Sequence, residues 1–393
     1  MSLGPSRRVL GLLLAICIGG IPLLATSPPA TRQEPNQLPY APITSGNWDD
    51  VSPAWSPDGS LIAFSSDANG VWQILTIEPN GSAARIMTPS SYDSSQPSWS
   101  PDSASMAFLS TQGSRTDVRV AFIRNSTVVT VTNGTYSVLP VRPNWNPDGT
   151  HLLFFVDSNG TLLVSADVAT GALQVVAPVA GVYDDADWLS PSEVIYSTLG
   201  QQGYEIDQMN LITRQKSVVV SGLANFTAPV VSLSTSKIAY VTNLIPPKYG
   251  PFSYPCAYQP GDYNLWVSDM DGSNATFQSA PVGEWDVGII PYPAPYTPAT
   301  ISPTQSLAWS SDGNMIAYTG YSDLYGTCIY LWDVSISASS LGLLGPTNAS
   351  SQGLTWSPDS VNLAFAAMED GHFHIFVLNT TNAIVPMPVN ILD

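Results

Sequence analysis

The sequence predicts an all-β protein, a β-propeller of four-stranded antiparallel blades, with seven blades favoured. Three observations lead to this prediction. A tryptophan-containing turn returns along the chain, short apolar runs alternate with polar turns between its copies, and the composition is rich in turn-forming and aromatic residues. The 393 residues include 34 prolines, 29 glycines and 11 tryptophans, whereas only 11% are charged. Such a composition is typical of short strands joined by many loops.

The repeated turn first occurs as A-W-S-P-D-G around Trp55, and its residue types explain its shape. Pro57 presets the first central φ angle, Asp58 can hydrogen-bond the local backbone, and Gly59 accepts a positive φ, so the turn closes a hairpin. Apolar strands are expected at 61–64 and 71–77, followed by a short strand at 84–88. Together with the strand before the turn, each unit therefore supplies four strands.

Copies of the turn recur at intervals typical of propeller blades, about 40–45 residues. They carry Trp55, Trp99, Trp145, Trp188, Trp309 and Trp356. The long interval after Trp188 hides a degenerate unit that places Val231, 43 residues later, where tryptophan would be. This makes seven units, or six if the Val231 unit is not a blade. The fixed place of the tryptophans favours packing between blades over sugar stacking.

The ring is expected to close near the N-terminal end of the repeats. The segment A-P-I-T-S, from Ala41, could add a strand to the last blade, whose own outer strand could be A-I-V-P-M-P-V from Ala383. The expected organisation is a signal peptide or N-terminal anchor at 1–27, a Pro-rich linker at 28–41 and a single propeller domain at 42–393. An insertion interrupts that domain at about 243–263.

The first residues indicate export. Arg7 and Arg8 precede an apolar run at 9–25, which small residues follow, as in a secretory signal peptide. The run is long for a signal core and short of the about 20 residues that cross a bilayer. A cleaved signal is favoured, and an uncleaved anchor is the alternative. Both predict an extracytoplasmic protein, which is secreted, periplasmic or anchored facing outside.

The W-S-P-D-[GS] turns at Trp55, Trp99 and Trp356, with weaker copies at Trp145 and Trp309, resemble the WD40-like (PD40) repeat family. This family includes the TolB propeller and the propellers of prolyl-oligopeptidase-type enzymes. The resemblance covers nearly everything after residue 42 and implies a propeller that serves as an interaction platform in the cell envelope. The α/β domain of TolB and the hydrolase domain of the peptidases are not expected here, so neither activity is carried over whole.

Motifs for catalysis are not found in the sequence. It contains neither a G-x-S-x-G elbow nor an H-E-x-x-H helix motif, and no catalytic residue is assigned. His372 and His374 would point to one face of a strand, but no third metal ligand is evident nearby, which favours a structural pair. The net charge of -18 argues against nucleic-acid binding and favours cations or a basic protein patch as partners.

Aromatic loops form the first candidate binding site. Connections between the second and third strands of a blade, and links between blades, should emerge on one face. The segments that begin at Asn243, Gly283 and Gly320 belong to these two kinds. They carry the candidate residues Tyr249, Phe252, Tyr254, Tyr258, Trp285, Tyr292, Tyr296 and Tyr325. Long loops on a rigid scaffold often bind partners, and packing of these rings on one another is the alternative.

Acidic residues near the expected channel mouth form the second candidate site. Asp49, Asp50, Asp93, Asp184, Asp185 and Asp187 are expected to precede the first strands of blades. Converging carboxylates could hold Ca²⁺ or attract a basic partner, although solvated loop acids are the favoured interpretation. No cofactor is expected, Ca²⁺ being the one cation considered.

Two cysteines in these loops are expected to form a disulfide. Cys256 lies in the blade-five insertion and Cys328 in the blade-six loop. Adjacent blades would place both on one face, and an exported protein can oxidise them. The disulfide would pin the insertion.

The function favoured by the sequence is that of an exported, non-enzymatic, TolB-like propeller that binds a protein or a glycan through the aromatic and acidic loops. The alternative is an extracytoplasmic enzyme of the polysaccharide lyase or hydrolase type, in which acids at the channel mouth act as general acid and base. No nucleic-acid partner is expected. Contact with a membrane is expected only through the N-terminal segment, if that segment is not cleaved.

Overall fold

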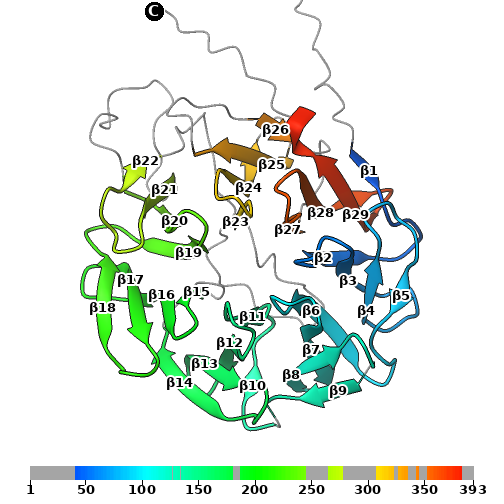
Figure 1. The fold of residues 1–393 in the computed structure, drawn as a ribbon, viewed down its shortest axis with the longest axis horizontal. Coiled ribbons are helices and arrows are strands. Elements are labelled where there is room, and N and C mark those ends of the chain that lie inside the picture. Colours follow the sequence, from blue (N-terminus) through cyan, green and yellow to red (C-terminus); the bar gives the residue numbers. More distant parts are fainter. Residues whose placement is uncertain are drawn as a thin grey trace, which may run out of the picture. The chain divides into compact units, whose positions relative to one another are not determined.

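The propeller is seen in a computed structural model that describes residues 40–125, 127–132, 134–179, 186–244, 264–277, 307–322, 326–334, 342–344 and 352–382. These residues form seven antiparallel sheets in chain order (Figure 1). The seven-bladed propeller is therefore confirmed, and the Val231 unit is one of its blades. Within the described ranges, no helix has the length and apolar character needed to cross a membrane.

The first four blades follow the chain from the inner strand outward. Blade one comprises β2 (Asp50–Trp55), β3 (Ile62–Ser66), β4 (Gln73–Ile77) and β5 (Arg85–Ile86). Blade two comprises β6 (Asp93–Trp99), β7 (Ser105–Gln112), β8 (Arg115–Phe122) and β9 (Thr127–Thr130). Blade three comprises β10 (Ser137–Val138) and β11 (Asn144–Trp145), which both pair with β12 (His151–Asp157), then β13 (Thr161–Asp167) and β14 (Leu173–Pro178). Blade four comprises β15 (Ala186–Ser190), β16 (Glu193–Leu199), β17 (Tyr204–Asn210) and β18 (Lys216–Val220).

The last three blades repeat the same order. Blade five comprises β19 (Phe226–Ser232), β20 (Lys237–Thr242), β21 (Asn264–Asp269) and β22 (Thr276–Phe277). Blade six comprises β23 (Leu307–Trp309), β24 (Met315–Ser322), β25 (Gly326–Asp333) and β26 (Gly342–Leu344). Blade seven comprises β27 (Gln352–Trp356), β28 (Asn362–Glu369) and β29 (His372–Asn379), and a short 3-10 turn (Thr380–Asn382) follows it.

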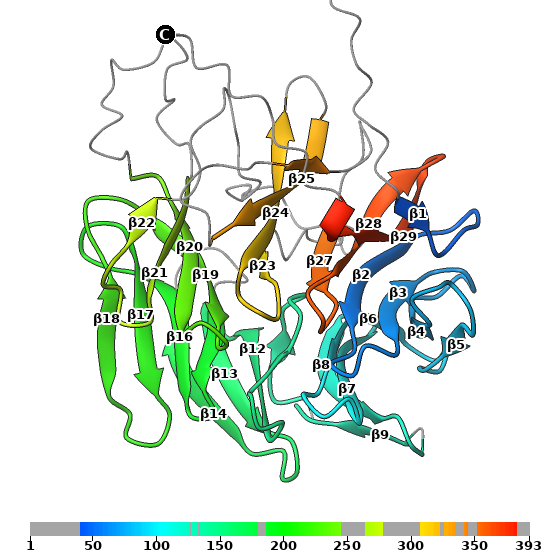
Figure 2. The same cartoon turned by 45° about the horizontal axis from the view of Figure 1, so that its top comes forward.

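The outer strand of blade seven comes from the other end of the chain. β1 (Tyr40–Pro42) pairs with β29, with Tyr40 opposite Leu378, and the two strands lie side by side in Figures 1 and 2. The predicted closing strand near Ala41 is thus confirmed. The A-I-V-P-M-P-V segment lies outside the described residues.

The hydrophobic core lies between the blades rather than within any one of them. Buried apolar residues form seven clusters in the described part of the chain, and each cluster joins two neighbouring blades. Ile74 of blade one, for example, belongs to the same cluster as Phe108 of blade two. Phe64 of blade one shares another with Ile375 of blade seven. Every sheet therefore buries both of its faces, as a radial repeat requires.

The S-P-D-G turn has the local role that its residues predict. Asp58 Oδ1 accepts hydrogen bonds from Ser56 Oγ at 2.6 Å and from Ser60 N at 3.0 Å, and Gly59 has a φ of 76°. The bond from Ser56, followed by those from Ser60, holds the pKa of Asp58 below its ordinary value. Asp102 and Asp359 repeat the same pattern. These carboxylates are therefore occupied in shaping turns.

Candidate functional site on the loop face

The loop face is the side of the propeller on which second strands connect to third strands and one blade links to the next. Hydrogen bonds between these two kinds of connection show that they lie together. Trp72 N, just before β4, donates to Asp93 Oδ1, at the start of β6, at 3.0 Å. Asp49 N, before β2, donates to Asp67 Oδ1, after β3, at 2.8 Å. These bonds agree with the prediction that both kinds of connection emerge on one face.

Three polar residues at equivalent positions tie blades one, two and five to the blades before them. Asp49, Asp93 and Asn225 lie six residues before the tryptophan position of their blades. Like Asp93, the other two accept a backbone N–H from the third strand of the preceding blade: Asp49 Oδ1 from Phe373 at 2.9 Å and Asn225 Oδ1 from Tyr204 at 3.2 Å. Two predicted binding acids thus stiffen the loop face. Asn225 was missed, although its spacing from Val231 would have found it.

Asp50 is enclosed rather than facing solvent. It begins β2 with only 1% of its surface exposed, and it pairs with Ser66 across the sheet. Burial raises its pKa above the ordinary value, whereas contacts from Ser66 and Thr44 and the charge of His374 act in the opposite direction. Its Oδ1 accepts no hydrogen bond within the described part of the chain. Asp50 is therefore a buried carboxyl at the edge of the loop face.

The two histidines of β29 lie beside the two acids of blade one. His372 Nδ1 is 3.5 Å from Asp49 Oδ1, and both side chains are about one third exposed, at 37% and 38%. His374 is buried with 5% exposed, and its Nδ1 makes no hydrogen bond to the described residues. Sequence reasoning treated these pairs separately, although a closed ring brings its first and last blades together. Among the residues that the structure describes, no three His, Cys, Asp or Glu side chains gather as metal ligands.

Five of the six repeated tryptophans link neighbouring inner strands, whereas the indole Nε1 of Trp55 donates to Gly59 O in its own turn at 3.3 Å. The indole Nε1 of Trp99 donates to Ala54 O at 3.0 Å, and that of Trp145 donates to Ser98 O at 3.0 Å. Each acceptor immediately precedes the tryptophan of the blade before. The same bond recurs from Trp188 to Asn144 O, from Trp309 to Val230 O and from Trp356 to Ala308 O. These bonds support the prediction that the tryptophans pack between blades.

A carboxylate makes the corresponding link where the tryptophan is missing. Val231 N donates to Asp187 Oδ2 at 2.8 Å, while Asp187 Oδ1 accepts bonds from Trp188 N at 2.8 Å and from Asn144 Nδ2 at 2.7 Å. Asp187 therefore joins blades three, four and five. Burial raises its pKa, and the three bonds act in the opposite direction. Asp187 lies within β15 rather than before it, which corrects its expected place ahead of the strand.

A bulge recurs three residues before the tryptophan position of the inner strands. Ser52, Gln96, Ala228 and Gly353 occupy it with φ angles of 55°, 57°, 51° and 69°, and the strand register shifts beside each. A non-glycine residue costs about 1 kcal/mol or more in this left-handed region. Bulges of this kind bend a strand and re-aim its side chains.

In blade three, the same position holds an arginine. Pro140 and Pro143 lack the N–H needed for pairing, and the inner strand is split there into β10 and β11. Arg142 lies between these prolines, and its Nη2 donates to Pro53 O of blade one at 2.9 Å. Arg142 thus connects two blades that are not neighbours in the ring.

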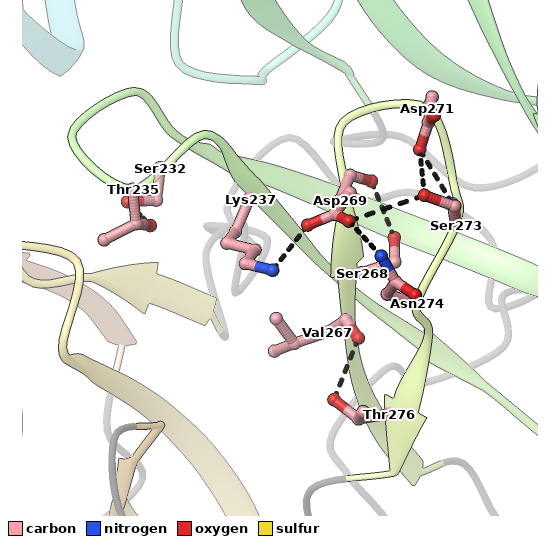
Figure 3. A network of polar contacts seen from close by, with 10 residues as sticks. All are labelled: Ser232, Thr235, Lys237, Val267, Ser268, Asp269, Asp271, Ser273, Asn274 and Thr276. Atoms are coloured by element: carbon pink, nitrogen blue, oxygen red, sulfur yellow. Dashed lines mark hydrogen bonds and ion pairs between the residues drawn. The ribbon is translucent and has the colours of Figure 1, made fainter.

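The stem of the predicted insertion is fastened at the opposite end of blade five. Lys237 Nζ, at the start of β20, lies 2.5 Å from Asp269 Oδ1, at the end of β21, and a dashed line marks this contact in Figure 3. Asn274 Nδ2 also donates to Asp269, and the Lys237 bond is the main cause of the lowered Asp269 pKa. β20 and β21 are therefore held together at the ends of the ladder opposite Thr242 and Asn264, between which the insertion lies in the sequence.

The remaining predicted site residues cannot be placed by the described structure. Outside the described ranges lie Tyr249, Phe252, Tyr254, Tyr258, Trp285, Tyr292, Tyr296, Tyr325, Asp184, Asp185 and Cys256. Cys328 belongs to β25, but its side chain is not among those described. The aromatic surface and the disulfide stay predictions.

Comparisons with known proteins agree with the fold. The family model for the TolB beta propeller domain, PD40, matches residues 37–192, which confirms the resemblance carried by the W-S-P-D-[GS] turns. Comparison with curated proteins gave no match.

Among solved structures, an oligogalacturonate lyase in complex with manganese is similar, with 13% identity, a TM-score of 0.62 and coverage of 86% of this chain and 92% of that chain. Oligogalacturonate lyase from Vibrio parahaemolyticus has 13% identity, a TM-score of 0.61 and coverage of 89% and 96%. The propeller domain of the Trilobed protease from Pyrococcus furiosus has 12% identity, a TM-score of 0.53 and coverage of 84% and 95%. At these identities the likeness shows the fold alone.

Proposed function

We propose that this PD40-like propeller is exported and binds a protein or a glycan through its loop face. The observation that carries the proposal is the set of bonds by which Asp49, Asp93 and Asn225 fix neighbouring blades on that face. A rigid scaffold of this kind is what long recognition loops require. The sequences between β20 and β21 and between β22 and β23 include residues 245–263 and 278–306, which are rich in tyrosine and proline.

Charge and aromatic content narrow the class of partner. The chain carries a net charge of -18, so a basic protein patch or an uncharged glycan meets less repulsion than a polyanion. Tyrosine and tryptophan supply large contact areas at low entropic cost. Export rests on Arg7 and Arg8 before the apolar run at 9–25.

The loop face can be tested by exchanging one connection. We expect that replacing residues 247–262 with a short Gly/Ser turn weakens binding about ten-fold or more to whichever probe the parent protein binds, a lysine-rich peptide or a neutral oligosaccharide from a glycan array. The control replaces the turn at 169–171 between β13 and β14, which lies at the opposite ends of the strands. Circular dichroism and urea unfolding should show both variants folded. Equal binding by both variants would overturn the assignment of the surface.

The second candidate is an enzyme, and the Asp49–His372 pair favours it. A carboxylate and an imidazole 3.5 Å apart and partly open to solvent are groups that serve general acid–base chemistry. The oligogalacturonate lyases share the fold, and one of them is described in complex with manganese. Incubation with oligogalacturonate and added Mn²⁺ separates the candidates: ultraviolet absorbance of an unsaturated product, lost in His372→Ala, would favour the enzyme. Binding without product formation would favour the platform.

A further inference from the structure

The ring is closed by residues 40–50, here called the closing segment, which run along β29. Beyond the pairing of β1, Ile43 N donates to Ile375 O at 2.8 Å, and Ile375 N donates to Thr44 Oγ1 at 2.9 Å. Asp49 Oδ1 accepts from Phe373 N at 2.9 Å. The contact that completes the propeller therefore depends on hydrogen bonds between the closing segment and the strand that carries both histidines.

Asp50 and His374 are enclosed where the closing segment, β2 and β29 meet. Both are more than nine-tenths buried, and each has a polar atom, Oδ1 or Nδ1, without a hydrogen-bond partner in the described part of the chain. Thr44 contacts the Asp50 carboxyl and also accepts the Ile375 N–H. A change of charge on this pair therefore acts directly on the closing contacts.

Other charged groups around the pair are less enclosed. The closing segment contributes Asp49, the blade-one turn contributes Asp67, β28 contributes Glu369, the β28–β29 turn contributes Asp370, and β29 contributes His372. None of the five is buried, so water screens their effect on the pair. Apart from the histidines, all of these groups are acids. When Asp50 is ionised, His374 is thus the group placed to balance its charge.

We propose that the Asp50–His374 pair is a proton-sensitive latch, which fastens the closing segment to β29 more tightly when the pair takes up a proton. With Asp50 ionised and His374 neutral, the seam encloses an uncompensated negative charge, which is costly. A proton taken up by the Asp50 carboxyl removes that charge. This inference is independent of the proposed binding function.

The direction of the pH effect follows from the surroundings of Asp50. Burial holds its pKa above the ordinary value. At a pH above the ordinary carboxyl range, Asp50 therefore binds more protons when the closing segment is paired with β29 than when the two are apart. The contact between the closing segment and β29 therefore becomes stronger as the pH falls toward the ordinary carboxyl range. It becomes weaker as the pH rises through the raised pKa of Asp50. One linked proton changes the closing equilibrium by at most about ten-fold per pH unit.

Hydrogen exchange tests the latch in the full chain. Protection factors for β29 amides are measured between about pH 5 and about pH 8 and normalised to β7 and β8 of blade two, which removes the intrinsic pH dependence of exchange. We expect β29 protection in the parent protein to rise on acidification, up to the ten-fold limit. Asp50→Asn should flatten the slope, because its amide carries no titratable charge. The control is Ser94→Ala at the same position of blade two, which should keep the parent slope.

His374→Gln is the second variant, and it still tests the proposal if Asp50→Asn does not fold. It removes the histidine charge that lowers the Asp50 pKa, so the rise in β29 protection should begin at a higher pH than in the parent protein. The proposal is overturned if parent protection stays constant or falls on acidification. It is also overturned if folded Asp50→Asn keeps the parent slope, or if folded His374→Gln keeps the parent pH dependence.

Discussion

Asp187→Ala is expected to lower the free energy of unfolding by about 3–5 kcal/mol, measured by urea denaturation. The carboxylate accepts bonds from Val231 N, Trp188 N and Asn144 Nδ2, which come from three blades. Alanine would leave these donors without their acceptor in a region where a buried, unpaired donor costs about 1–3 kcal/mol. The effect should be large because the inner strand of blade five has Val231 in place of the tryptophan whose indole makes this link in other blades.

Two further variants serve as controls for the effect of Asp187→Ala. Ser98→Ala changes the residue at the same position in blade two, where the link uses the backbone carbonyl, so its effect should stay within about 0.5 kcal/mol. Asp187→Asn keeps one acceptor oxygen but places an amide N–H against a backbone N–H. Its loss of unfolding free energy should therefore lie between those of Asp187→Ala and Ser98→Ala. A loss of less than about 1 kcal/mol in Asp187→Ala would show that water or neighbouring groups replace the carboxylate.

Trp99→Ala is expected to cost about 3–5 kcal/mol of unfolding free energy because it opens a cavity between blades one and two. Trp99 is buried in the cluster that these blades share. Trp99→Phe should cost much less, about 1–2 kcal/mol, because it keeps most of the packing but removes the donor to Ala54 O. The difference between the variants separates packing from the inter-blade hydrogen bond, and urea denaturation measures both.

A tryptophan outside the inner strands serves as the comparison. Trp72 is partly exposed, and its backbone rather than its indole donates to Asp93. Trp72→Phe should therefore change the unfolding free energy by less than about 0.5 kcal/mol. If Trp99→Ala cost no more than Trp72→Phe, the repeated tryptophan would not be a principal inter-blade contact.

Local chemistry explains why so much of the architecture could be predicted. The S-P-D-G turn is complete within a few consecutive residues, and the bonds of Asp58 to Ser56 and Ser60 are the kind that its sequence favours. The spacing of the repeats then predicted the number of blades, including the one with Val231. The closing strand near Ala41 followed because a ring of blades needs a last outer strand.

The candidate site depended much more on contacts between distant residues. Asp49 meets Phe373 from 324 positions away, and Asp187 meets Val231 from 44 positions away. Sequence reasoning grouped Asp49, Asp50 and Asp187 as acids near a channel mouth. In the structure Asp49 ties blade one to blade seven, Asp50 is a buried carboxyl that feels the charge of His374, and Asp187 links three blades. Composition and spacing cannot distinguish these roles, because each depends on which donor the neighbouring blade presents.

By itself, then, the sequence determined the all-β class, the number of blades and the turn residues, because short-range hydrogen bonding and a regular apolar pattern are encoded in consecutive positions. Only the tertiary structure decided which acids are enclosed and which partners they bind. Burial arises when two sheets pack face to face, and that packing brings together residues such as Asp50 and His374, which belong to the first and last blades and are far apart in the sequence.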